Sequence, residues 1–139
     1  MTTKAIDLFA AFATDEAAEE NGIMTPVPGA GDTLFKIARA GNKTYNRLFQ
    51  KLLKQNKPIL DAKGDAAEKK AEEIFIEVMS KSILLGWEGE ILFAGEMLPY
   101  SRDNAKKLLA HKEFRAAVTS ISEDFNQFKA VKDEEDEKN

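Results

Sequence analysis

The chain has 139 residues, of which 43% are hydrophobic, and its nine Phe and one Trp supply enough apolar material for one hydrophobic core. It contains no cysteine, which excludes disulfide bonds, thiolate zinc sites and cysteine nucleophiles. The longest apolar run, Leu8–Ala13, is far shorter than the roughly 20 residues of a membrane-spanning helix, so we expect a soluble protein of the cytoplasm.

Charge is segregated along the chain. Residues 1–35 carry one Lys against six acids, residues 36–60 carry seven bases and no acid, and residues 61–139 carry twelve bases against eighteen acids. The net charge therefore runs −5, +7 and −6 from end to end. A basic centre between acidic ends can attract a nucleic acid, an acidic partner or a second copy of the chain, or it can simply solvate helix faces.

The first predicted element is a short helix that ends by Gly22. Ile6, Phe9, Ala10 and Ala13 recur at helical spacing before an acidic run that leads to this glycine.

The next segment, residues 23–39, predicts a β-hairpin. Its two prolines and its glycines disfavour a long helix, and residues 23–25 and 34–39 can pair across the Pro/Gly-rich loop with Phe35 and Ile37 on one face. A lone hairpin is only marginally stable in water, so it would need a helix to lie on.

The most regular predicted helix follows Asn42, a plausible N-cap, and stops at Pro58. Its apolar residues recur at helical spacing and are Tyr45, Leu48, Phe49, Leu52 and Leu53. Its basic residues form a stripe on the opposite side and are Lys43, Arg47, Lys51, Lys54 and Lys57.

The pattern predicts a second long helix from Ala67 to about Gly86, with mainly acidic residues on its solvent side. These acids are Glu68, Glu72, Glu73 and Glu77. Three glycines around a short apolar run then favour a loop or a small hairpin, and residues 86–100 are predicted to be irregular.

The C-terminal part predicts more helix. Ser101 is a helix cap, with Asp103 in the first turn. A later set of apolar residues forms a heptad seam that could pack on an antiparallel neighbour or on a partner helix. This seam comprises Phe114, Val118, Ile121, Phe125 and Phe128.

Together these patterns predict a mainly α fold, a compact bundle of about four to five helices with a small β-hairpin near residues 23–39 and an irregular loop near 86–100. Residues 1–130 would form a single helical domain. Residues 131–139 are polar and mainly acidic, and we expect a disordered acidic tail because they cannot bury enough apolar surface to offset chain ordering.

The sequence offers little for catalysis, so we expect no enzyme. The single His111 has no carboxylate placed to orient it, and the Glu pairs at i, i+4 lack the accompanying Glu-x-x-His of a helical metal site. Residues 28–32 contain a Gly-x-Gly motif. They lack the third glycine of a dinucleotide-binding fingerprint and the Gly-Lys-Ser/Thr of a P-loop. No catalytic, cofactor-binding or metal-binding residue is predicted, and no cofactor.

Several uncommon segments, taken in order, resemble the tail assembly chaperones of long-tailed bacteriophages. These segments are Thr14–Glu16, Asn21–Gly22, Phe35–Asn42 with Tyr45, Leu85–Trp87, Gly95–Ser101, Asn104–Ala105 with Leu108–Leu109, and Phe125–Phe128 with the charged tail. Each is weak alone, but in order they span most of the chain.

The resemblance implies a non-enzymatic helical protein of the bacterial host cytoplasm that binds the tape measure protein and keeps its hydrophobic helices soluble. It implies self-association around this client and absence from the mature virion. It also implies a frameshift-extended form that recruits the tail tube protein. Residues 137–139 can be encoded GAA AAA AAC, which contains the heptamer of a −1 frameshift, although synonymous codons would remove it.

Seven residues are candidates for partner binding or self-association: Arg39, Lys43, Arg47, Lys51, Lys54, Trp87 and Tyr100. The charge layout predicts a head-to-tail, salt-sensitive oligomer in which the basic stripe meets an acidic region of the next copy. For the two aromatic residues the alternative is that they pack inward as lids on the helix pair.

Two other functions remain open from the sequence. One is a phage structural or adaptor protein that is retained in the particle. The other is a small nucleic-acid-binding regulator that uses the stripe from Lys43 to Lys57, which is disfavoured by a pI near 5.2 and by the presence of only one basic helix.

Overall fold

The computed structural model describes residues 5–130. Its elements in chain order are α1 (Leu8–Phe12), α2 (Glu16–Asn21), β1 (Ile23–Pro26), β2 (Leu34–Ile37), α3 (Lys43–Gln55), α4 (Lys57–Asp61), α5 (Asp65–Ser82), β3 (Leu84–Glu88), β4 (Leu92–Phe93), β5 (Glu96–Met97), α6 (Arg102–Ala110), α7 (Lys112–Glu123) and the 3-10 helix η1 (Phe125–Phe128).

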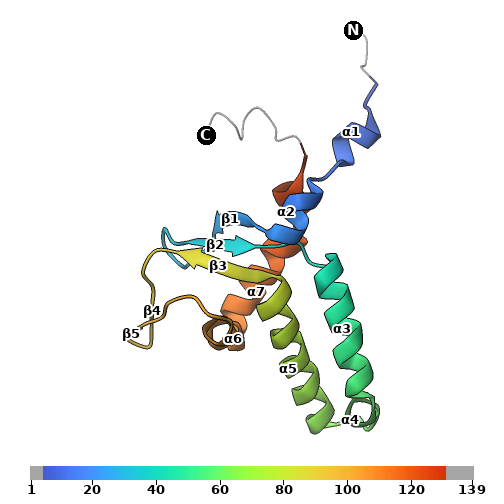
Figure 1. Ribbon diagram of the computed structural model, residues 1–139, viewed down its shortest axis with the longest axis vertical. Coiled ribbons are helices and arrows are strands. Elements are labelled where there is room, and N and C mark those ends of the chain that lie inside the picture. Colours follow the sequence, from blue (N-terminus) through green and yellow to red (C-terminus); the bar gives the residue numbers. More distant parts are fainter. Residues whose placement is uncertain (1–4, 131–139) are drawn as a thin grey trace.

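A three-stranded antiparallel sheet, in the order β1-β2-β3, forms the centre of the molecule (Figure 1). The predicted hairpin is present, with Ile23 opposite Ile37 in β1 and β2. Successive side chains of a strand point to opposite faces, and accordingly Phe35 and Ile37 are buried while Lys36 between them is exposed.

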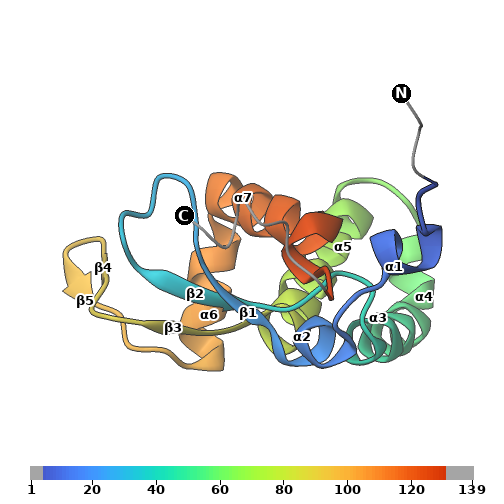
Figure 2. The same cartoon turned by 90° about the horizontal axis from the view of Figure 1, so that it is seen from above.

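One face of the sheet carries the core. α7 packs against β2, α6 packs against β3, and the C-terminal part of α5 leads directly into β3 (Figures 1 and 2). The buried core residues from these elements include Phe35, Ile37, Met79, Leu84, Leu109 and Val118. The hairpin thus has the helical support that its short strands need.

α3, α4 and the N-terminal half of α5 form a helical arm that extends away from the sheet (Figure 1). α3 and α5 run antiparallel, and the rings of Phe49 and Phe75 meet edge to face with centroids 6.3 Å apart. The Asn42 side chain caps α3 as predicted, because its Oδ1 accepts a hydrogen bond from the backbone N–H of Tyr45 at 2.8 Å.

The prediction of a mainly α bundle of four to five helices is wrong. Helices make up 57% and strands 15% of the described residues, in two antiparallel sheets, so the fold is mixed α and β. The main reason is β3, which lies in a segment predicted as helix end and loop. It joins β2 through non-local pairing, with Leu84 opposite Ile37 and Glu88 opposite Leu34.

The loop predicted for residues 86–100 is in part regular and contains the small hairpin that its glycines allowed. Its first residues belong to β3, and β4 and β5 form a two-residue ladder in which Leu92 faces Met97 and Phe93 faces Glu96. Ala94 and Gly95 at the turn both have positive φ, the conformation that tight hairpin turns require.

Two predicted helices are interrupted, one by a long-range contact and one by a local cap. The N-terminal helix is split into α1 and α2 because Thr14 forms an isolated β-bridge with Lys129, and Asp15 then caps α2. The predicted heptad seam is split because α7 ends at Glu123 and Asp124 caps η1.

The acidic tail predicted for residues 131–139 lies outside the described residues. Among residues 5–130, no helix combines the length and apolar character needed to cross a bilayer.

Candidate partner-binding surfaces

The basic stripe predicted from the sequence is an exposed surface of α3. Lys43, Arg47, Lys51 and Lys54 are all exposed, and they lie on the side of α3 opposite the half-buried residues that face α5. None of the four forms an ion pair with another described residue. We call these four residues the basic face.

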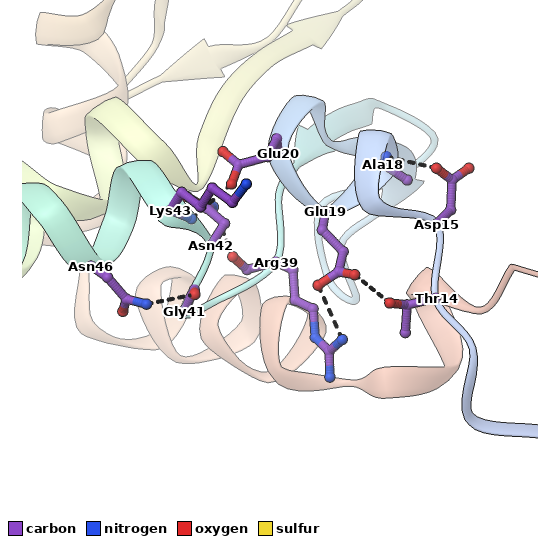
Figure 3. Close-up of polar contacts among 10 residues, drawn as sticks. All are labelled: Thr14, Asp15, Ala18, Glu19, Glu20, Arg39, Gly41, Asn42, Lys43 and Asn46. Atoms are coloured by element: carbon purple, nitrogen blue, oxygen red, sulfur yellow. Dashed lines mark hydrogen bonds and ion pairs between the residues drawn. The ribbon is translucent and has the colours of Figure 1, made fainter. Parts of the chain in front are cut away.

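Arg39, the fifth predicted basic residue, is not part of that face. Its guanidinium pairs with Glu19 of α2 at 3.2 Å (Figure 3). It also lies 6.0 Å from the ring centroid of Phe125. The Glu19 carboxylate also accepts a hydrogen bond from the Thr14 hydroxyl. Arg39 therefore joins α2 to the C-terminal segment within the molecule, and its side chain remains 29% exposed.

The acids of α5 were predicted to face solvent, and Glu68, Glu72 and Glu73 are exposed while Glu77 is half-buried. Two of these acids also bind neighbouring helices. Glu72 pairs with Arg115 of α7 at 3.1 Å, and Glu77 pairs with Lys106 of α6 and, at 2.7 Å, with Lys81. Burial acts to raise the pKa of Glu77, but the hydrogen bonds and charges of the two lysines outweigh it, so this pKa lies below its ordinary value. These acids hold helices together.

The start of α3 is bound to α2 by a second set of polar contacts. The Glu20 carboxylate accepts a hydrogen bond from the backbone N–H of Lys43 at 2.7 Å (Figure 3). It accepts a second one from the Thr44 hydroxyl at 3.4 Å. This places a negative charge at the positive end of the helix dipole. The adjacent groove, of about 510 Å³, is lined by residues of α2 and the α3 start.

The structure brings the two predicted aromatic residues together at the end of the sheet. Trp87 is half-buried, its indole N–H donates to the Leu98 carbonyl at 3.2 Å, and its ring lies 6.1 Å from that of Phe35. Tyr100 lies edge-on to Trp87 with centroids 5.1 Å apart. Trp87 therefore packs against the sheet and its following loop, whereas Tyr100 remains 39% exposed.

The largest exposed apolar surface was not among the predicted sites. In and before α1, the exposed fractions are 75% for Ile6, 65% for Leu8, 86% for Phe9 and 65% for Phe12. α1 extends away from the body of the molecule (Figure 1). We call these four residues the apolar arm.

The apolar arm has two local attachments. The Asp7 carboxylate caps α1 by accepting from the Ala10 N–H at 3.3 Å, and the rings of Phe12 and Phe125 lie 5.5 Å apart. This surface could have been predicted from the sequence. A helix that packs on a core needs apolar residues on one side only, whereas α1 is apolar on every side.

A smaller exposed apolar patch lies at the opposite end of the molecule from α1 (Figures 1 and 2). It is formed by the cross-strand pair Leu92 and Met97, which are 65% and 54% exposed. The segment also borders a groove of about 300 Å³ that Phe35 and Phe114 help to line.

Within residues 5–130 the structure has no group of three or more His, Cys, Asp or Glu side chains that could hold a metal ion. The features available for recognition are therefore surfaces: the basic face, the apolar arm and the smaller patch.

Comparison with curated proteins and with solved structures gave no significant match. A family model described as YdaY prophage protein matches residues 40–139, which include the basic face, the core helices and β3. This match covers more than half of the chain. The protein therefore belongs to the YdaY prophage protein family and is of bacteriophage origin.

Proposed function

We propose that this prophage protein is a tail assembly chaperone, which binds the tape measure protein in the bacterial cytoplasm and leaves before the virion is complete. Membership of the prophage protein family supports a function in a bacteriophage. The ordered segments that resemble tail assembly chaperones support the role as a chaperone. In this role the protein has no catalytic activity. It self-associates around its client, and a frameshift-extended form recruits the tail tube protein.

The observation that carries the proposal is the exposure of the apolar arm. Short isolated helices are unstable in water, and four large apolar side chains on such a helix favour burial against another apolar surface. The four side chains of the apolar arm remain mostly exposed among the described residues. A long hydrophobic helix of the tape measure protein offers the matching surface, since two apolar helix faces can pack by ridges into grooves.

The test is co-expression with helical fragments of the tape measure protein encoded by the same prophage. We expect the wild-type chain to keep such fragments in the soluble fraction and to co-purify with them. The variant Leu8→Ser with Phe9→Ser should lose both effects while retaining its circular dichroism spectrum, because both side chains are exposed.

The matched control changes the other exposed apolar patch. Leu92→Ser with Met97→Ser removes a similar apolar surface at the opposite end of the molecule and should retain the client. Equal retention by both variants would show that the arm does not bind the client.

Mass spectrometry of purified virions separates a chaperone from a structural or adaptor protein. We expect the chain to be absent from particles. Stoichiometric amounts in the particle would overturn the chaperone proposal and favour the structural role.

A further inference from the structure

The basic face of α3 lacks a counter-charge among residues 5–130. Its four cations extend from Lys43 to Lys54, eleven residues or about 16 Å along the helix axis. No described carboxylate pairs with them. A row of like charges repels itself, so an anionic partner along this face would be stabilising.

The nearest described acids are already engaged. Glu19 binds Arg39 and Thr14, and Glu20 accepts from the start of α3 through backbone and hydroxyl groups (Figure 3). In α5, Glu77 binds Lys106 of α6, Glu72 binds Arg115 of α7 and Glu73 binds Lys70, whereas Glu68 forms no ion pair with a described residue. Because no described acid pairs with the basic face, another segment or another molecule can supply its counter-charge.

One such segment is present in the same chain. Residues 133–137 are five consecutive acids, Asp133, Glu134, Glu135, Asp136 and Glu137. No other stretch of the sequence has such a run of one charge. Its five negative charges are opposite in sign to the four positive charges of the basic face.

The described chain ends close enough for this segment to reach α3. The backbone N–H of Ala130 donates to the Ala13 carbonyl at 3.0 Å, just before α2, and Glu20 at the other end of α2 contacts the start of α3. α2 has six residues and so covers only about 9 Å. Seven extended residues after Ala130 span up to about 23 Å, enough to bring residues 133–137 to the first turns of α3.

We propose that the acidic segment 133–137 docks on the basic face of α3 in the same chain and shields it from other anions. A tethered segment acts at an effective concentration in the millimolar range, which favours the same chain over a second copy. The basic face is exposed and the two partners carry opposite charges, so the contact weakens as salt screens it. An anion that binds the basic face must displace this segment.

The test measures how accessible the basic face is to an anionic probe, fluorescein-labelled dT20, by anisotropy at 50 mM salt. We expect a tail-neutral variant, Glu134→Gln, Glu135→Gln, Asp136→Asn and Glu137→Gln, to bind the probe about ten-fold more tightly than the wild type. The difference should disappear in high salt, where phosphate contacts weaken.

The control variant makes the same change in net charge at four other exposed acids, Asp32→Asn, Glu88→Gln, Glu90→Gln and Glu96→Gln. It should alter probe affinity less than about two-fold. Adding Arg47→Gln and Lys51→Gln to the tail-neutral variant should abolish its gain, because these changes remove the centre of the basic face.

Backbone amide NMR gives a second readout without a probe. Neutralising the segment should shift the α3 amide signals around Arg47 and Lys51 at 50 mM salt and not at 1 M salt. Three outcomes would each overturn the proposal: an equal affinity gain in the control variant, a gain that survives loss of Arg47 and Lys51, or shielding that disappears on dilution. The last would place the acidic segment of a second copy on the face.

Discussion

The side chain of Asn42 donates a hydrogen bond to the backbone carbonyl of Ser82 at 3.0 Å, which joins the start of α3 to the end of α5 across 40 residues of sequence. The same amide group donates to the Arg39 carbonyl at 2.8 Å, while its oxygen caps α3. Asn42 is only 6% exposed. One buried side chain thus fixes where the helical arm leaves the sheet.

Replacing Asn42 by Ala should destabilise the protein by about 2–3 kcal/mol. The change removes a helix cap, worth about 1 kcal/mol, and leaves a buried carbonyl without its donor, which costs about 1–3 kcal/mol. Urea unfolding measures the loss. Asn46→Ala is the matched control, since Asn46 makes only an exposed bond to the Gly41 carbonyl, and it should change stability by less than about 0.5 kcal/mol. Equal losses would contradict the role of Asn42.

Gly22 should tolerate a side chain poorly. Its φ is +88°, and a Cβ there would lie 3.0 Å from Cγ of Lys36 and 3.2 Å from the backbone carbon of Ile37. Gly22→Ala should therefore cost about 2–3 kcal/mol, through backbone strain and the close approach of β2.

Gly29 is the control for that experiment, because it has the same φ of +88° but no atom within 4 Å of the added Cβ. Gly29→Ala should cost only about 1 kcal/mol, the strain of the backbone alone. Thermal unfolding of both variants measures the difference, and equal melting temperatures would show that the contact with β2 is unimportant.

Two phenylalanines near the ends of the described chain should differ sharply in their contribution to stability. Phe128 is 1% exposed, so Phe128→Ala should destabilise the protein by about 3–5 kcal/mol. Phe9 is 86% exposed, so Phe9→Ala should leave the free energy of unfolding within about 0.5 kcal/mol of wild type. A large loss in Phe9→Ala would mean that α1 packs on this chain in solution.

The Glu77 ion pairs should make stability depend on pH in the acid range. Because the pKa of Glu77 is lowered in the folded state, its stabilisation is complete above its unfolded-state pKa of about 4.3 and is lost as the pH falls through the lower folded-state pKa. Wild type should exceed Glu77→Gln by about 1 kcal/mol at pH 7, and the difference should vanish in strong acid.

Denaturant unfolding from pH 7 to pH 2 provides the measurement. Glu68→Gln is the control, since Glu68 is exposed and forms no ion pair with a described residue. The free energy of unfolding of Glu68→Gln should change with pH in the same way as that of the wild type. A difference between wild type and Glu77→Gln that stays constant with pH would contradict the ionic origin of the effect.

Sequence patterns located the elements whose signals are local. The Asn42 and Ser101 caps and the helical spacing of apolar residues in α3 and α5 are properties of neighbouring residues, so they could be predicted. The exposure of the basic face followed from the same periodicity, because residues opposite an apolar stripe face solvent.

The remaining features depended on contacts between distant residues. β3 became a strand because the edge of β2 was available to Leu84–Glu88, and the bridge between Thr14 and Lys129 divided the N-terminal helix. Arg39 and Glu77 looked like surface charges by spacing, yet each found a partner on another element.

The sequence by itself therefore determined α3, most of α5, the Asn42 and Ser101 caps, the first hairpin and the segregation of charge, since these are properties of neighbouring residues. Only the tertiary structure decided the third strand and which charges were neutralised, because pairing depends on distances that folding creates. It also decided that the apolar arm stays uncovered, because burial depends on whether another part of the chain packs over it.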